Sequence, residues 1–161
     1  MTIAVGDKLP DATFKVRTPD GLKDVTTQEL TAARKVILFA VPGAFTPTCH
    51  AKHVPSYLAH LDALKAKGIA EVACVAVNDA FVLDAWAKAT GADGKITLLS
   101  DGNGTFTKAI GLDFDGSGFG LGTRSKRYSM LVDNGVVKAL HIEESPGVME
   151  VSGADHLLAA L

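Results

Sequence analysis

Residues 46–49, Thr-Pro-Thr-Cys, are the stretch of this chain whose residue types are best suited to chemistry. They follow a strand-like apolar run that ends abruptly at Pro42. A threonine followed by a proline is typical of a helix start, with Thr46 as the N-cap and Pro47 in the first helical position. Cys49 would then lie in the first turn, where unpaired backbone N–H groups and the helix dipole favour a thiolate. The position makes Cys49 a candidate nucleophile, with a small buried apolar side chain as the alternative.

The residues around Cys49 suit attack on a peroxide. That reaction needs a thiolate, together with donors that hold both oxygens while charge moves onto the leaving one. The hydroxyl of Thr46, one turn before Cys49, can donate to or accept from a bound peroxide. Pro42 has no backbone N–H and can shield the sulfur from water. A fixed cation would complete such a site by stabilising the thiolate and the departing oxygen together.

Strands and helices alternate in the pattern of apolar residues. The predicted elements are a hairpin at 12–26, a buried strand at 35–41, a helix at 47–67, a strand at 72–77, a helix capped by Asn78 or Asp79, a strand at 96–100, a short helix at 104–111, a Gly-rich loop at 116–122, a hairpin of strands at 127–132 and 136–142, and a helix at 152–161. The helix after Asp79 is expected to turn Phe81, Val82, Ala85, Trp86 and Ala89 inward. This order predicts a thioredoxin-like three-layer α/β/α sandwich with a mixed central sheet and an N-terminal β-hairpin extension.

Composition limits the function classes. The 161 residues fit a single domain, 1–161, and 47% hydrophobic with 21% charged residues is ordinary for a globular protein. A net charge of −2 does not indicate nucleic-acid binding, and no apolar run is long enough to span a membrane. The N-terminus does not resemble a signal peptide, so we expect a cytoplasmic protein. The two cysteines, Cys49 and Cys74, are too few for a disulfide scaffold.

The segment PGAFTPTCH, residues 42–50, resembles the peroxiredoxin signature P-x-x-x-T-x-x-C, in the PGAFTPxC form of the type II, or peroxiredoxin-5-like, branch. The resemblance extends over essentially the whole chain, including VGDKLPDATF, CVAVNDAFV and TRSKRYSMLVDNGVVKALHIE in the same order. It implies a thiol peroxidase that reduces hydrogen peroxide and organic hydroperoxides through a cysteine sulfenic acid, with no metal, haem or flavin cofactor. Pro42, Thr46 and Cys49 match the proline, the threonine and the peroxidatic cysteine of the family.

The resemblance also implies a catalytic arginine that precedes a late strand. Arg127 stands in that place, immediately before YSMLV, and Arg124 is the competing candidate three residues earlier. We favour Arg127 because the start of a strand is the more rigid mount.

Cys74 lies in the middle of a predicted strand between apolar neighbours, so a buried and unreactive thiol is the expected state. The family leaves a resolving role open: plant type II members resemble this chain in having a second cysteine at such a place. The cysteine near the C-terminus that the mammalian member uses is absent here. We therefore expect a one-cysteine cycle with an external thiol reductant, glutathione with glutaredoxin or, second, thioredoxin. The resemblance further implies a homodimer that covers Phe45, Phe81 and Phe119.

Other functions are less well supported. A peroxide sensor or redox chaperone on the same fold would keep Cys49 but show little turnover. A cysteine hydrolase would need a Cys/His/Asn signature, and none is apparent. His50 and His53 follow Cys49, but no fourth ligand is in view for a metal, and His53 is expected to fix the local helix or backbone. The Gly-rich loop does not have the spacing of a dinucleotide-binding motif.

Overall fold

A computed structural model describes residues 2–161, and its centre is a seven-stranded mixed sheet in the order β2-β1-β5-β4-β3-β8-β9. These strands are β1 (Thr13–Thr18), β2 (Gly21–Thr26), β3 (Lys35–Val41), β4 (Glu71–Ala76), β5 (Thr97–Ser100), β8 (Tyr128–Asp133) and β9 (Val136–Ile142). The helices are α1 (Thr27–Thr31), α2 (Val54–Ala66), α3 (Ala80–Thr90), α4 (Thr105–Ala109) and α5 (Ala154–Ala159). Strands β3, β4 and β5 run parallel, whereas β8, β9 and the β1–β2 hairpin are antiparallel to their neighbours.

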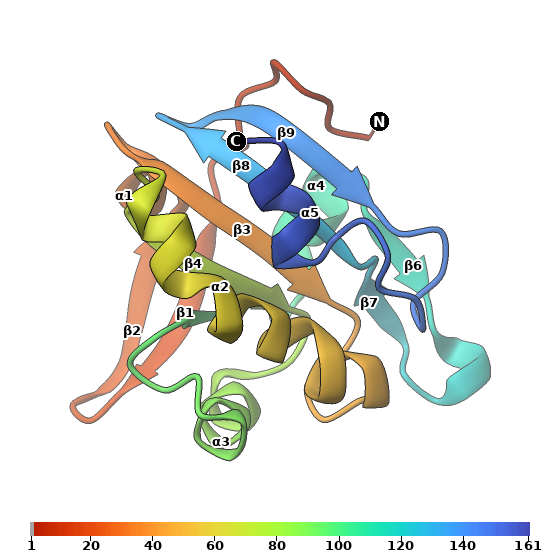
Figure 1. Cartoon of the computed structure of the whole chain (residues 1–161). Helices are drawn as coiled ribbons and strands as arrows, with labels where there is room; N and C mark the ends of the chain where they lie inside the picture. The colour runs from red at the N-terminus through yellow and green to blue at the C-terminus, as the bar shows by residue number, and fades with distance from the viewer. Residues whose placement is uncertain (1) are drawn as a thin grey trace.

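Helices cover both faces of the sheet, which makes three layers (Figure 1). Helices α2, α3 and α5 pack on one face through buried side chains such as Tyr57, Trp86 and Leu157. On the other face α1 and α4 contribute Leu30 and Phe106. The predicted thioredoxin-like sandwich is confirmed, as is the N-terminal hairpin, whose two strands meet at the pair Thr18↔Gly21.

Strand β3 is the central element that carries the chain into the Cys49 region. It lies between the parallel strand β4 and the antiparallel strand β8, and helices cover both of its faces, so its apolar sequence is unbroken. The carboxyl ends of the parallel strands β3 and β4 lie at one edge of the sheet, where the side-chain oxygen of Asn78 accepts a hydrogen bond from the backbone N–H of Ala44 at 2.9 Å. This bond fixes the loop after β3 to the loop after β4.

The β8–β9 hairpin brings residues 127 and 143 together at that same edge of the sheet. Asn134 and Gly135 form its two-residue turn with positive φ of 48° and 81°, as the sequence predicted. At the open end Tyr128 pairs with Ile142, and the N–H of Glu143 donates to the carbonyl of Arg127 at 2.9 Å. Arg127 is thus mounted on the sheet at the start of β8.

The prediction for the inner face of α3 was wrong except at Trp86. The buried positions are Ala80, Leu83, Trp86 and Ala87, while Phe81, Val82, Ala85 and Ala89 are exposed. Asp79 caps the helix, its carboxylate accepting from the N–H of Val82 at 2.8 Å, and this start point sets which residues face the sheet. The buried alanines are Ala80 and Ala87, whereas the expected Ala85 and Ala89 face solvent.

The predicted Gly-rich loop contains more structure than expected. A 3-10 turn, Ser117–Phe119, joins two short antiparallel strands, β6 (Asp113–Asp115) and β7 (Thr123–Ser125). The pair Phe114↔Arg124 lies in this small sheet, which stands apart from the main sheet at its β8 side (Figure 1).

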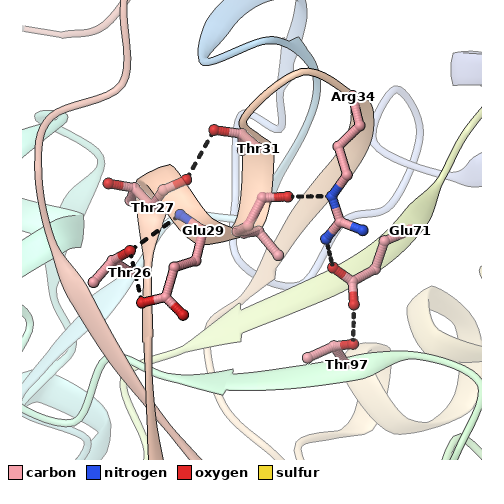
Figure 2. A network of polar contacts seen from close by, with 8 residues as sticks. Thr26, Thr27, Glu29, Thr31, Arg34, Glu71 and Thr97 are labelled. Atoms are coloured by element: carbon pink, nitrogen blue, oxygen red, sulfur yellow. Dashed lines mark hydrogen bonds and ion pairs between the residues drawn. The ribbon is translucent and has the colours of Figure 1, made fainter.

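A network of polar contacts ties α1 to the amino ends of β4 and β5 (Figure 2). Thr26 caps α1 by accepting from the N–H of Glu29 at 3.1 Å, and its hydroxyl also contacts the Glu29 carboxylate at 3.1 Å. Beyond the helix, Arg34 donates to one carboxylate oxygen of Glu71 at 2.6 Å, and Thr97 donates to the other at 2.8 Å. These contacts lie at the edge of the sheet opposite to Cys49.

Candidate active site

The helix that carries Cys49 begins at Pro47, as predicted, but its first part is a π-helical turn, Cys49–His53. The N–H of Val54 bonds to the carbonyl of Cys49, five residues earlier, instead of to residue 50. Such turns occur frequently at functional sites. Nothing in the hydrophobic spacing predicted this turn, because the apolar positions of α2 begin after it.

The sulfur of Cys49 is fully buried and lies at the meeting point of two donors. The Thr46 hydroxyl oxygen and Nη2 of Arg127 each lie 2.9 Å from Sγ. The same hydroxyl oxygen is 2.7 Å from the carbonyl oxygen of Gly43. Since the hydroxyl has one proton, it donates a hydrogen bond either to the sulfur or to the carbonyl of Gly43. When it donates to Gly43, its lone pairs can accept a hydrogen bond from a ligand. The predicted capping contact to a backbone N–H is replaced by these two contacts.

Arg127 is a buried cation, with a side chain only 1% exposed. Its Nε and Nη2 donate to the carbonyl of Pro146 at 3.2 and 3.0 Å, and its Nη1 contacts Nδ1 of His53 at 2.8 Å. Within residues 2–161, no carboxylate forms an ion pair with Arg127. Among its hydrogen-bond acceptors, only the Cys49 sulfur can carry negative charge. A buried charge is costly without a counter-charge, and a negative charge that forms on this sulfur is paired with Arg127.

His53 is a neutral acceptor for Arg127. Its burial, together with the Arg127 cation beside it, lowers the pKa of His53 from 6.5 to about 3. Nε2 lies 3.0 Å from the carbonyl oxygen of Ser152, which can only accept, so Nε2 carries the proton and Nδ1 presents its lone pair to Arg127. Tyr57 donates to the same carbonyl at 2.8 Å. His53 therefore contacts the backbone at Ser152, as expected, and also accepts a hydrogen bond from Arg127.

Arg124 contacts the same loop from another side. Its Nη1 donates to the carbonyl of Pro42 at 3.3 Å and its Nε to the carbonyl of Leu121 at 2.9 Å. A Cβ atom at Gly43 would lie 2.7 Å from Nη1, so any other residue there would displace the guanidinium group from its present position. Of the two candidate arginines, Arg127 contacts the sulfur, whereas Arg124 holds the turn that includes the buried Pro42.

Cys74 is fully buried in β4, paired with Phe39 of β3 on one side and Leu98 of β5 on the other. It belongs to the same apolar cluster as Cys49, on the face that α2 and α3 cover. Burial, and then the proximity of Cys49, raises the pKa of the Cys74 thiol well above its usual value. Both cysteines are free thiols. Cys74 is buried, as its apolar neighbours predicted, and its raised pKa favours the protonated thiol.

Several groups at the site were not identified from the sequence, chiefly the carbonyls of Pro146 and Ser152, the hydroxyl of Tyr57 and the carboxylate of Glu143. Tyr57 could have been found, because it lies four residues after His53 and therefore on the same side of the helix. The carbonyls of Pro146 and Ser152 could not have been found from the sequence, because every residue type has a main-chain carbonyl.

Outside this site, a cavity of about 380 Å³ opens between α2 and α3 at the amino ends of β4 and β5. It shares no lining residue with the Cys49 site. In the described part of the chain, no group of three or more His, Cys, Asp or Glu side chains is placed to hold a metal ion. Nor does any helix there have the length and apolar character needed to cross a membrane.

Comparisons with known proteins agree with this geometry. The Redoxin family model matches residues 4–158. Peroxiredoxin-2E-2, chloroplastic, of Oryza sativa subsp. japonica is 54% identical over 165 residues, which cover 99% of this chain and 73% of that relative. The chain belongs to the redoxin family and is a peroxiredoxin. Peroxiredoxin-2B of Arabidopsis thaliana is 44% identical over 99% of this chain and 98% of its own length.

The solved structures place this peroxiredoxin in the same fold. Reduced Prx3 of Vibrio vulnificus in complex with h2o2 superposes with a TM-score of 0.93 at 50% identity, covering 99% of this chain and 96% of that one. The expected resemblance to the type II, peroxiredoxin-5-like branch is confirmed, and with it the assignment as a thiol-dependent peroxidase.

Proposed function

We propose that Cys49 is the peroxidatic cysteine of this peroxiredoxin and that its substrates are hydrogen peroxide and small organic hydroperoxides. The observation that carries the proposal is the convergence of Thr46 Oγ1 and Arg127 Nη2 on one buried sulfur, each at 2.9 Å. The related Vibrio vulnificus protein was crystallised with h2o2, which supports a peroxide as substrate.

In the proposed first step, the Cys49 thiolate attacks the terminal oxygen of the hydroperoxide. The S–O bond forms as the O–O bond breaks, so the sulfur is oxidised to a sulfenic acid. The other oxygen leaves as hydroxide or alkoxide and takes up a proton from solvent to become water or an alcohol. The Thr46 hydroxyl donates a hydrogen bond to the carbonyl of Gly43 and accepts one from the peroxide O–H, while Arg127 donates toward the two peroxide oxygens. Pro42, which lacks an N–H, closes the site beside the sulfur without offering a competing donor. No prosthetic group takes part in this step.

The proposed second step restores Cys49 with an external thiol. The first thiol attacks the sulfenic sulfur and releases water, and a second thiol displaces Cys49 from the mixed disulfide. A Cys49–Cys74 disulfide is disfavoured because Cys74 is a fully buried thiol in a central strand. We propose glutathione with glutaredoxin as the reductant and thioredoxin as the second candidate.

Stopped-flow oxidation by hydrogen peroxide tests the assignment. Cys49→Ser should lose the reaction, while the control Cys74→Ser should keep most of its turnover with glutathione and glutaredoxin. Mass spectrometry after one equivalent of peroxide and glutathione should find the adduct on Cys49. Peroxide consumption by Cys49→Ser at more than a few per cent of the wild-type rate would refute the assignment. Fast oxidation of the wild type without turnover would instead indicate a peroxide sensor.

We also propose a homodimer formed through the end of the molecule that carries Cys49. Phe45, Phe81 and Phe119 are 51%, 54% and 82% exposed, which is costly for large apolar side chains in water. Phe45 and Phe81 follow the carboxyl ends of the neighbouring strands β3 and β4. Analytical ultracentrifugation of the reduced protein at micromolar concentration should show a dimer, and Phe119→Glu should weaken it.

A cytoplasmic location stays a prediction. Two of the similar plant relatives carry names that place them in the chloroplast, and Peroxiredoxin-2B carries no such term. A fluorescent fusion of the full chain in its own cells would test the location.

A further inference from the structure

Glu143 is a buried carboxylate that the reaction outlined above does not use. It follows β9 directly and is 6% exposed. Its oxygens accept from the backbone N–H groups of Glu150, Val151 and Ser152 at 2.9, 3.0 and 2.8 Å, and from the Ser152 hydroxyl at 2.5 Å. No cation pairs with it among residues 2–161. A carboxylate buried with only neutral donors is expensive to keep, so its contacts require an explanation.

The contacts of Glu143 close a loop, residues 144–151, that surrounds Arg127. The carbonyl of Pro146 in this loop accepts from Nε and Nη2 of Arg127, and the carbonyl of Gly147 accepts from the Thr48 hydroxyl at 2.8 Å. The backbone N–H of Glu143 also donates to the carbonyl of Arg127. Glu143 therefore holds Arg127 through its main chain and holds the two ends of the surrounding loop together through its side chain.

A continuous series of hydrogen bonds leads from Glu143 to the sulfur. The Ser152 N–H donates to Glu143, and the Ser152 carbonyl accepts from Nε2 of His53. Nδ1 of His53 accepts from Nη1 of Arg127, whose Nη2 donates to Cys49. The bonds between Arg127 and Glu143 all donate toward the carboxylate, whereas the bond from Arg127 to Cys49 donates the other way, toward the sulfur. At Ser152 the N–H and the C=O belong to different peptide groups, so Glu143 acts there by fixing the position of the residue.

We propose that Glu143 is a positioning residue for the peroxidase reaction: it fixes the Ser152 carbonyl, through which His53 keeps the tautomer and orientation that direct Arg127 at Cys49. The inference rests on the proposed role of Arg127. Without the carboxylate, the 150–152 segment loses its shared acceptor and the Ser152 carbonyl is free to turn. His53 and the guanidinium group then lose their common orientation, although neither is substituted.

Glu143→Gln tests this role because it keeps the size of the side chain and removes half of its acceptor capacity. Its second-order rate with hydrogen peroxide at neutral pH should fall about 10-fold to 100-fold, the scale of a misplaced catalytic group. The pH at which that rate is half-maximal should move upward, because a poorly directed Arg127 stabilises the thiolate less. Glu144→Gln, which removes the same charge from an exposed neighbour, should leave both the rate and its pH profile unchanged.

A double-variant comparison separates positioning through Arg127 from other effects. Arg127→Met alone should lower the rate strongly, and adding Glu143→Gln to it should cause little further loss, because the group to be positioned is gone. An equal fold-loss from Glu143→Gln in both backgrounds would overturn the inference, as would a Glu143→Gln rate that matches Glu144→Gln.

Two further results complete the test. If Glu143→Gln does not fold, as judged by near-ultraviolet circular dichroism, Ser152→Ala removes a single donor to Glu143. It should lower the rate and shift the pH profile in the same direction by a smaller factor; an unchanged rate and profile would then overturn the inference. A wild-type rate in Arg127→Met would refute the proposed role of Arg127 itself. A strong loss there beside a normal Glu143→Gln would refute only the role of Glu143.

Discussion

Two arginines at opposite edges of the same sheet show how surroundings decide what a cation does. Arg34 is 36% exposed and lies 2.6 Å from the carboxylate of Glu71 (Figure 2). Arg127 is 1% exposed, and its acceptors are a carbonyl, a neutral imidazole and a thiol. The charge of Arg34 is matched by Glu71 whether or not Cys49 is ionised. The charge of Arg127 is matched only when Cys49 is ionised.

The difference is one of energy as well as of partners. A partly exposed ion pair such as Arg34–Glu71 contributes about 0.2–1 kcal/mol, because water already stabilises both charges. Arg127 is buried, so the effective dielectric around it is lower and each charge near it interacts more strongly. The position therefore suits a charge that appears and disappears during a reaction.

Removing the buried cation should have the largest effect. Arg127→Met should lower the second-order rate with hydrogen peroxide by about 10²–10³-fold, the scale of losing one positioned donor to a developing charge. Arg34→Met should leave the rate within about twofold of wild type, since Arg34 pairs with Glu71 and does not contact Cys49. Stopped-flow traces of both variants would decide; equal effects would erase the distinction between the two arginines.

The Thr46 hydroxyl is the second group that contacts the Cys49 sulfur, and removing it should have the next largest effect on the rate. Thr46→Val keeps the shape of the side chain and should lower the same rate by about 10²-fold. The control is Thr48→Val, whose hydroxyl bonds to Gly147 instead of the sulfur and whose loss should cost only a few-fold. A rate for Thr46→Val close to that of the control would remove Thr46 from the mechanism.

His53 should make the Cys49 edge sensitive to acid. Between pH 6.5 and about 3 the unfolded chain binds a proton at His53 and the folded chain does not, so stability falls as the pH falls through this range. From pH 7 to 5 the loss attributable to His53 is about 2 kcal/mol. His53→Gln, which can still donate to Ser152 and accept from Arg127, should show a decrease smaller by that amount. Urea titrations at the two pH values would measure it, and equal decreases would contradict the assignment of a neutral His53.

The smallest expected effect is on the Arg34 side. Glu71→Gln should lower the free energy of unfolding by about 1 kcal/mol or less, because the ion pair is partly exposed and Thr97 keeps a donor–acceptor contact. High salt should reduce the difference further. A loss of several kcal/mol in urea titrations would show that the Arg34–Glu71 pair is not the weak surface contact that its exposure indicates.

Most of the fold could be predicted because its signals are local. The buried run of β3, the Asn134-Gly135 turn and the cap at Asp79 each follow from neighbouring residues. The inner face of α3 could not be predicted in the same way, because the choice between Phe81 and Leu83 depends on how the helix sits on the sheet. The π-turn at Cys49 likewise depends on contacts made by the folded chain.

The candidate site was predictable where side chains act and unpredictable where the main chain acts. Cys49 and Thr46 lie three residues apart, and the structure brings them together as the helical spacing indicates. Arg127 comes from 78 residues away in the sequence, and only the resemblance to a family pointed to it. Glu143 and the carbonyls of Pro146 and Ser152 depend on a loop whose path no residue type prescribes.

The use of main-chain carbonyls has a practical consequence for protein engineering. Arg127 and His53 bind the backbone at residues 146 and 152, so exchange of exposed side chains between those positions leaves their acceptors in place. Gly147 is exposed and Val148 and Met149 are half-buried in this stretch, and Gly147 likewise contributes its main-chain carbonyl, to Thr48. Proline substitution at 150–152 is the exception, because it would delete an N–H that Glu143 needs. Side chains at positions 147–149 can thus be exchanged without removing the main-chain acceptors of Arg127 and His53.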